Sequence, residues 1–345
     1  MGAAARRSSS PRKRARGSAS WLSLPLFACA AVGVLQFYHP PRSLVVRPFA
    51  AGQRLAPVPA AEPSANAYGQ SGEVKVRFAL PSEPVDYPLE VQGDPTSLAY
   101  EWLQLDDSTS AEPARPLSGA QLVAPPKPGF YRLALVRGAE HRVVDGMTLT
   151  VLVPFSQKLG TTLNGYHIGT YIAEKLGERH DTPEGFVEVS KSAVDLPITK
   201  HLRLGDFVTH DGQDVWPRYA AVSPRLLDKL ELVIAEIARL RGDTSHVQVA
   251  LDVHSGFRTP SYNRNVKRSA RDSRHQYGDA ADVTIDANFD GRYSLIDSRL
   301  VEAAVEKVER DHPDLVGGMG LYTSRRYSTP YVHIDARGNR ARWRG

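Results

Sequence analysis

Apolar and polar residues alternate in several short segments of the chain, which is the pattern of half-buried β-strands. The clearest of these segments are residues 74–80, 98–102, 131–135 and 147–153. Short alternating strands separated by turn signals such as Pro128-Gly129 predict a small all-β, sandwich-like domain over residues 71–155. Trp102 lies inside one of these strands, which favours a core position over a glycan-stacking role.

Two later segments repeat apolar residues at helical spacing. The first follows the capping residue Ser223 and ends before Gly242, and the second runs from about Ser298 to Arg310. Strand-like segments surround these helices at residues 247–253, 281–285 and 332–334. Helices packed on an antiparallel sheet predict an α+β domain, which we place at residues 156–345.

The chain begins with a basic segment, residues 1–20, which is followed by an apolar segment, residues 21–38. This order is that of a signal peptide or an uncleaved signal anchor, with the basic residues on the cytoplasmic side. Ala28-Cys29-Ala30 fits a cleavage site, and a lipid-modified Cys29 is a third possibility. Each possibility exports the rest of the protein. Residues 39–70, rich in Pro and Ala, predict an extended linker.

The net charge of +5 does not indicate a nucleic-acid-binding fold. Six of the positive charges belong to lysine and arginine residues between positions 1 and 20, where there is no acid, so the remainder of the chain has a net charge of −1. We therefore expect no nucleic-acid partner. Cys29 is the single cysteine, which excludes both a disulfide and a thiolate metal site in the exported part.

Three residues of the C-terminal region have the chemistry of a metal site. His275 and Asp282 lie within His-Gln-Tyr-Gly-Asp-Ala-Ala-Asp, and His333 lies within Tyr-Val-His-Ile-Asp. Two imidazoles and a carboxylate suit Zn²⁺, and three protein ligands leave a fourth position for water, as in catalytic sites. A water bound in that position titrates near neutral pH and becomes a nucleophile for hydrolysis.

These motifs, together with Ser255-Gly-Phe-Arg-Thr-Pro260 upstream and Gly317-Gly-Met-Gly320 downstream, occur in an order that resembles the M15 family of zinc peptidases. The resemblance covers roughly residues 160–345 and is to the M15A C-terminal type. That family contains D-Ala-D-Ala carboxypeptidases and murein endopeptidases, and it shares its fold with the hedgehog signalling domain. The resemblance implies a hedgehog-like zinc peptidase domain with His275, Asp282 and His333 as the zinc ligands.

The resemblance also implies roles for residues beside the metal ligands. Arg258 matches the family arginine that holds a substrate carboxylate or an oxyanion, and Ser255 and Tyr322 are further candidates for substrate binding. Some family members have a glutamate base three residues before the last histidine, where this chain has Pro330. Asp335 is therefore the candidate catalytic base, or else a carboxylate that orients a ligand histidine.

The sequence thus predicts a zinc metallopeptidase, either a carboxypeptidase or a murein endopeptidase, whose substrate and partner is peptidoglycan. We expect it on the periplasmic side of the cell envelope, anchored in the inner membrane by its N-terminal segment or exported after cleavage. Because Pro330 cannot act as a base, a non-catalytic, metal-containing cell-wall-binding protein is the alternative. A β-module adaptor that contacts membrane or nucleic acid through its basic end is a third hypothesis, which the charge distribution disfavours.

Overall fold

The structure, a computed structural model, describes residues 57–92, 94–117, 121–177, 181–240, 242, 249–323 and 329–345. Residues 55–345 form one compact unit. The predicted basic segment, the predicted apolar segment and residues 39–56 of the predicted linker lie outside the described residues. The extended-linker prediction is wrong for residues 57–70, because Ala61–Pro63 pair as strand β1 with β4 and Val58 and Ala67 are buried. Within the described part of the chain, no helix combines the length and apolar character needed to cross a membrane.

A six-stranded sheet dominates the N-terminal part of this unit, in the strand order β2-β10-β8-β5-β6 with β9 paired to β8. Its strands are β2 (Val76–Ala79), β5 (Ala99–Gln104), β6 (Arg115–Pro116), β8 (Gly129–Arg137), β9 (Glu140–Val143) and β10 (Thr148–Val151). The pairing of β2 with β10 is parallel and the other pairings are antiparallel, so the sheet is mixed. Two short ribbons accompany it, formed by β1 (Ala61–Pro63) with β4 (Leu89–Val91) and by β3 (Pro84–Val85) with β7 (Leu122–Val123).

Aromatic residues fill the core of this sheet region. The Trp102 ring makes edge contacts with Tyr87 and Tyr100 at centroid distances of 5.7 and 6.4 Å, respectively. Its indole N–H donates to the carbonyl of Val123 at 2.8 Å. Trp102 is therefore a buried core residue and is not positioned to stack on a glycan.

Short elements follow the sheet region. They are the three-stranded sheet of β11 (Val153–Pro154), β14 (Gly185–Val189) and β15 (Arg218–Ala220), the ribbon of β12 (Thr162–Leu163) with β13 (Tyr166–His167), and the helix α1 (Ile172–Leu176). Buried Tyr166, Tyr171 and Tyr219 pack here in the same hydrophobic core as the C-terminal elements. This region therefore packs against the C-terminal sheet through a shared hydrophobic core.

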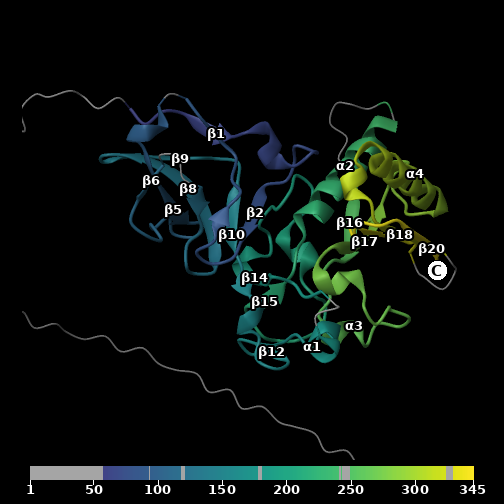
Figure 1. The fold of residues 1–345 in the computed structure, drawn as a ribbon. Coiled ribbons are helices and arrows are strands. Elements are labelled where there is room, and N and C mark those ends of the chain that lie inside the picture. Colours follow the sequence, from purple (N-terminus) through teal and green to yellow (C-terminus); the bar gives the residue numbers. More distant parts are fainter. Residues whose placement is uncertain are drawn as a thin grey trace, which may run out of the picture. The chain divides into compact units, whose positions relative to one another are not determined.

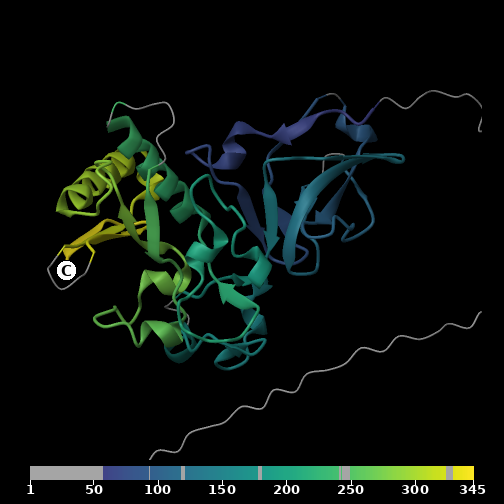
Figure 2. The same ribbon diagram turned by 180° about the vertical axis from the view of Figure 1, so that it is seen from behind.

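The C-terminal part is a five-stranded sheet with two long helices. The strand order is β16-β17-β19-β18-β20, and every pairing is antiparallel except that of β18 with β20. These elements are β16 (Leu251–Ser255), α3 (Pro260–Asn263), β17 (Ala280–Ile285), α4 (Leu295–Asp311), β18 (Gly318–Tyr322), β19 (Tyr331–Asp335) and β20 (Ala341–Arg344), preceded by α2 (Pro224–Leu240). Figure 1 and Figure 2 show α2 and α4 side by side next to this sheet, and α4 contacts β17, β18 and β19. The predicted α+β class is confirmed.

The two helices form where the sequence pattern placed them, with one difference. The apolar face of α2 is buried, and the helix ends at Leu240, two residues before Gly242. Helix α4 begins at Leu295, three residues before the predicted start at Ser298. The reason is a capping box, in which Ser294 accepts from the helix backbone and Asp297 accepts from the backbone N–H of Ser294 at 2.8 Å.

Candidate metal centre

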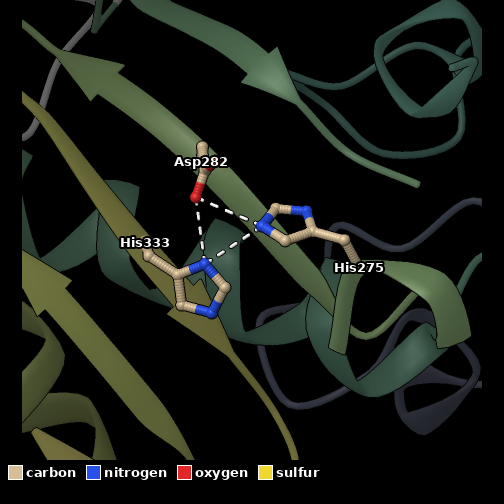
Figure 3. Close-up of side chains that lie close together, drawn as sticks. All are labelled: His275, Asp282 and His333. Carbon is tan, nitrogen blue, oxygen red and sulfur yellow. Dashed lines mark hydrogen bonds and ion pairs between the residues drawn. The ribbon is translucent and has the colours of Figure 1, made fainter. Parts of the chain in front are cut away.

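His275, Asp282 and His333 come together from three separate elements, as Figure 3 shows. His275 lies on a single 3-10 turn, Arg274–Tyr277, whereas Asp282 and His333 lie on the central strands β17 and β19. Asp282 and His333 are direct partners in the antiparallel register of these strands. Directly opposite residues project to the same face of a sheet, so the strand pairing itself brings the carboxylate beside the imidazole.

The three side chains present one atom each to a common point. His275 Nε2 lies 3.2 Å from Asp282 Oδ1 and 3.1 Å from His333 Nδ1, and His333 Nδ1 lies 2.9 Å from Asp282 Oδ1. All three residues are buried, with exposed fractions of 1, 6 and 6% in chain order. They form a group that could hold a metal ion.

Hydrogen bonds on the far side of each imidazole decide which nitrogen has the lone pair. His275 Nδ1 lies 2.7 Å from the carbonyl oxygen of Gly256, and His333 Nε2 lies 3.1 Å from Asp335 Oδ2. Because both of these oxygens accept, the two nitrogens must donate, which leaves lone pairs on His275 Nε2 and His333 Nδ1. With both imidazoles neutral, two lone pairs and a carboxylate oxygen then face one another, an arrangement that a metal ion or a proton between them stabilises.

The spacing of these atoms fits Zn²⁺. Zinc–nitrogen and zinc–oxygen bonds of about 2.0–2.2 Å in a tetrahedron place neighbouring ligand atoms about 3.3 Å apart. The three observed separations, 2.9–3.2 Å, are close to that value. A small outward adjustment of the side chains is enough to accommodate the ion.

The pKa shifts of the three groups also indicate that the site stabilises a positive charge. Burial lowers the pKa of His275. Burial acts on His333 in the same direction, but hydrogen bonds to Asp282 and Asp335 outweigh it and raise the pKa of His333. Burial would raise the pKa of Asp282, yet the charges and hydrogen bonds of both histidines hold it well below its usual range. These directions show that the three groups together stabilise a positive charge placed between them.

Asp335 lies behind His333, on the side of the ring away from the common point. Its carboxylate is fully buried and accepts from the backbone N–H of Gly318 at 2.7 Å and from Arg337 Nε at 2.9 Å, in addition to its contact with His333. Burial opposes ionisation here, but these hydrogen bonds hold the pKa of Asp335 far below its usual range. Of the two roles that the sequence left open for Asp335, this geometry favours the orientation of His333 over proton transfer.

Arg258 contacts the metal centre from the side. Its Nη2 pairs with Asp282 Oδ2, the oxygen that does not face the histidines, and its Nε donates to Ser255 Oγ at 2.7 Å. Arg258 therefore holds the ligand carboxylate in place, and Ser255 fixes the orientation of Arg258. The Arg258 guanidinium is thus paired with a protein carboxylate and not free for a substrate. Ser255 does not line the neighbouring cavity, so a direct role in substrate binding is not supported among the described residues.

The metal centre opens into a cavity of about 480 Å³. The cavity is lined by the three candidate ligands, by aromatic residues of the β18, β19 and β20 strands, and by basic residues of the segment that follows α3. Tyr322 is one of the aromatic residues and stacks on Tyr331 at a centroid distance of 4.5 Å. A buried metal group at an open cavity is the arrangement that a hydrolytic site requires, because substrate must reach the ion.

Two residues of this site, Arg337 and Trp343, were missing from the sequence-based candidates. The Trp343 ring lies 5.1 Å from the ring of His333, and its indole N–H donates to Tyr322 Oη at 2.9 Å. Arg337 lies over the Trp343 ring at 5.7 Å while it pairs with Asp335. The sequence places both residues in a basic C-terminal end, and the spacing Asp335-x-Arg337 was the one signal that could have linked them to the site.

His254 precedes the Ser255–Pro260 motif in the sequence but is not one of the candidate metal ligands. His254 is exposed and lies 3.4 Å from Asp252 on the same strand, so it is no metal ligand here. Comparison of the chain with protein-family models, with curated proteins and with solved structures finds no match.

Proposed function

We propose that this protein is a zinc-dependent peptidase of the bacterial cell envelope that hydrolyses peptide bonds in peptidoglycan stem peptides or cross-links. The observation that carries the proposal is the convergence of two imidazole lone pairs and one carboxylate oxygen at a buried point that opens into a cavity. The ordered motifs that resemble the M15 peptidases support the same function.

Zinc is the metal that this donor set favours. Two nitrogens and one carboxylate oxygen, with no cysteine among the ligands, suit Zn²⁺ with an open fourth position. When bound, Zn²⁺ supplies Lewis-acid polarisation of a peptide carbonyl and lowers the pKa of a water molecule. Arg258 and Asp335 hold Asp282 and His333 in the orientation that this binding needs.

A proton acceptor is needed for hydrolysis, and Asp335 is poorly placed for that role. Asp272 is the one carboxylate side chain besides Asp282 among the described residues that line the cavity, and Tyr277 donates a hydrogen bond to it. Residues 324–328, which follow β18, contain no acid in the sequence. Asp272 is therefore the candidate proton acceptor among the described cavity residues, and Asp335 is assigned the orientation of His333.

The location in the envelope rests on the N-terminal sequence pattern and on the resemblance. A basic segment followed by an apolar one would deliver the rest of the chain to the periplasmic side, where peptidoglycan is found. The part of the Pro- and Ala-rich segment that precedes the folded unit, residues 39–56, would then separate that unit from the inner membrane.

The proposal is tested with full-length wild-type protein and a His275→Ala variant. We expect about one zinc per wild-type chain, release of muropeptides from purified sacculi, and loss of both in the variant. A His254→Ala variant is the matched control, because this exposed histidine lies outside the metal group. Undiminished zinc content and sacculus digestion by His275→Ala would overturn the proposal.

A non-catalytic wall-binding protein is the second candidate, and one observation favours it. Pro330 stands where some relatives have a glutamate base, and Asp335 is engaged in orienting contacts. Such a protein would retain zinc and bind sacculi without releasing any muropeptide, so the same digestion measured by mass spectrometry separates the two functions.

A further inference from the structure

The cavity beside the metal centre is rich in positive charge. Five of the described residues that line it have cationic side chains, namely Arg258, Lys267, Arg268, Arg274 and Arg337. Two lining residues, Asp272 and Asp282, have carboxylates. An excess of cations in a confined space attracts anionic groups of a substrate.

Three of the five cations are already bound to carboxylates of the protein. Arg258 pairs with Asp282, and Arg337 pairs with Asp335. Arg274 Nε donates to both oxygens of Asp279 at 3.0 and 2.9 Å. These arginines hold the site together, so a substrate carboxylate would have to compete with an existing ion pair.

Lys267 and Arg268 differ from those three arginines. Both side chains are exposed, and neither has a hydrogen bond or an ion pair with another described residue. No carboxylate of the described residues is therefore bound to either of them. A substrate carboxylate could bind there without displacing a carboxylate of the protein.

The backbone that presents these two residues is fixed on both sides. Asn263, the last residue of α3, donates from its side chain to the carbonyl of Ala270 at 2.9 Å. Its own carbonyl accepts from the hydroxyl of Ser269 at 2.7 Å. Residues 264–270 therefore form a closed loop with a fixed base, which holds the backbone of the two cations beside the cavity and limits the backbone entropy lost on binding.

We propose that Lys267 and Arg268 form a subsite that binds a free carboxylate of the substrate peptide. This inference rests on the proposed peptidase function and assigns substrate recognition to residues other than Arg258, the arginine indicated by sequence. Charge-assisted hydrogen bonds from an ammonium and a guanidinium are well suited to a carboxylate. The substrate is then a peptide with a free carboxylate near the hydrolysed bond, at either its C-terminus or a side chain.

The test uses full-length zinc-loaded protein and three versions of one stem peptide: unmodified, amidated at the C-terminus, and amidated at its side-chain carboxylates. The double variant Lys267→Ala/Arg268→Ala should raise KM for the unmodified peptide by about tenfold or more, with kcat little changed. The amidated version that lacks the recognised carboxylate should already have the higher KM with wild-type protein, and the double variant should not raise it further. That version identifies which carboxylate is bound.

Arg264→Ala is the matched control, because Arg264 is an exposed cation of the same loop that does not line the cavity. It should leave KM unchanged for all three peptides. Calorimetric binding of the unmodified peptide to zinc-free protein gives a readout that is independent of catalysis, and the double variant should weaken it by a similar factor.

The outcomes separate this inference from the proposed function. If wild-type protein hydrolyses the peptides but the double variant and the control have the same KM and affinity, the subsite is refuted and the peptidase function stands. If wild-type protein binds the unmodified peptide more tightly than one amidated version, and the double variant abolishes that difference, yet no peptide is hydrolysed, the subsite stands and the peptidase function fails. Equal binding of all three peptides refutes the subsite in either case.

Discussion

His333 and Asp335 lie two residues apart on β19, and His333 Nε2 donates to Asp335 Oδ2 at 3.1 Å. Alternate residues of a strand project to the same face, so the carboxylate lies beside the ring that it orients. Gly318 and Arg337 hold Asp335 from the other side. This chain of contacts fixes His333 Nδ1 as the atom that faces Asp282 and His275.

Asp335→Asn should therefore weaken metal binding. The amide can no longer accept from the imidazole with full charge, and we expect zinc affinity to fall about 10–100-fold. Competition with a chromophoric chelator measures that affinity, with the exposed Asp252→Asn as control. If zinc affinity is unchanged while kcat collapses at saturating zinc, Asp335 is the catalytic base and the orienting role is wrong.

A buried ion pair connects the helices to the strand of the metal centre. Lys229 of α2 is fully buried and donates to Glu309 of α4 at 2.7 Å and to the carbonyl of Asp335 at 2.7 Å. Its burial lowers the pKa of Lys229 even though Glu309 opposes that effect.

Lys229→Ala should reduce the free energy of unfolding by about 3–5 kcal/mol, because it leaves a buried carboxylate with one partner fewer and opens a cavity. Urea denaturation at neutral pH measures the change. Lys307→Ala, which breaks the exposed pair with Asp311 on the same helix α4, should leave the midpoint almost unchanged. Equal effects of the two substitutions would contradict a structural role for the buried pair.

Three buried tyrosines predict loss of stability at alkaline pH. Burial raises the pKa of Tyr166, Tyr171 and Tyr219, and hydrogen bonds to Asp211 and Glu188 raise the pKa of Tyr166 and Tyr219 further. In the unfolded chain tyrosine titrates at about pH 10. Below that pH both states are protonated, and above it the unfolded chain releases protons that the folded protein retains, so the stability decreases as pH rises.

Urea titrations between about pH 9 and 11.5 should show this decrease, with tyrosinate absorbance appearing together with unfolding. Tyr166→Phe removes one of the three groups and should make the decrease less steep. Gradual ionisation of these tyrosines in the folded protein would contradict their inaccessibility.

Gly320 and Trp343 lie so close together that no side chain fits at position 320. A Cβ atom there would lie 2.2 Å from the indole nitrogen of Trp343. Gly320→Ala should displace the ring from His333 and Tyr322 and reduce the free energy of unfolding by about 1–3 kcal/mol. Thermal unfolding and tryptophan fluorescence report both effects.

Trp343→Phe is the comparison for that substitution, since it removes the hydrogen bond to Tyr322 and keeps a ring against His333. We expect a smaller loss of stability and retained zinc. If Gly320→Ala unfolds at the same midpoint as the wild type, β18 and β20 can move apart without loss of stability. That result would contradict the prediction that the contact between Gly320 and Trp343 is tightly packed.

Local patterns in the sequence predicted the elements that bear the site. The helical spacing identified α2, and alternation identified β17 and β19 with Asp282 and His333 on them. Alternation could not predict that β2 and β10 pair in parallel, because partner choice depends on contacts between residues about seventy positions apart. Helix α4 begins before the first residue of the apolar pattern, because the capping box of Ser294 and Asp297 fixes the start of the helix.

The amino-acid sequence by itself determined which side chains could bind a metal, since imidazole and carboxylate chemistry belongs to the residue types of His275, Asp282 and His333. Tertiary structure alone decided that these atoms meet and that Arg258 pairs with Asp282. It also decided that Lys267 and Arg268 line the cavity. The physical reason is that an ion pair or a lone-pair direction depends on distances of a few ångströms between distant segments. Those distances are set by strand register and core packing, which short-range patterns do not encode.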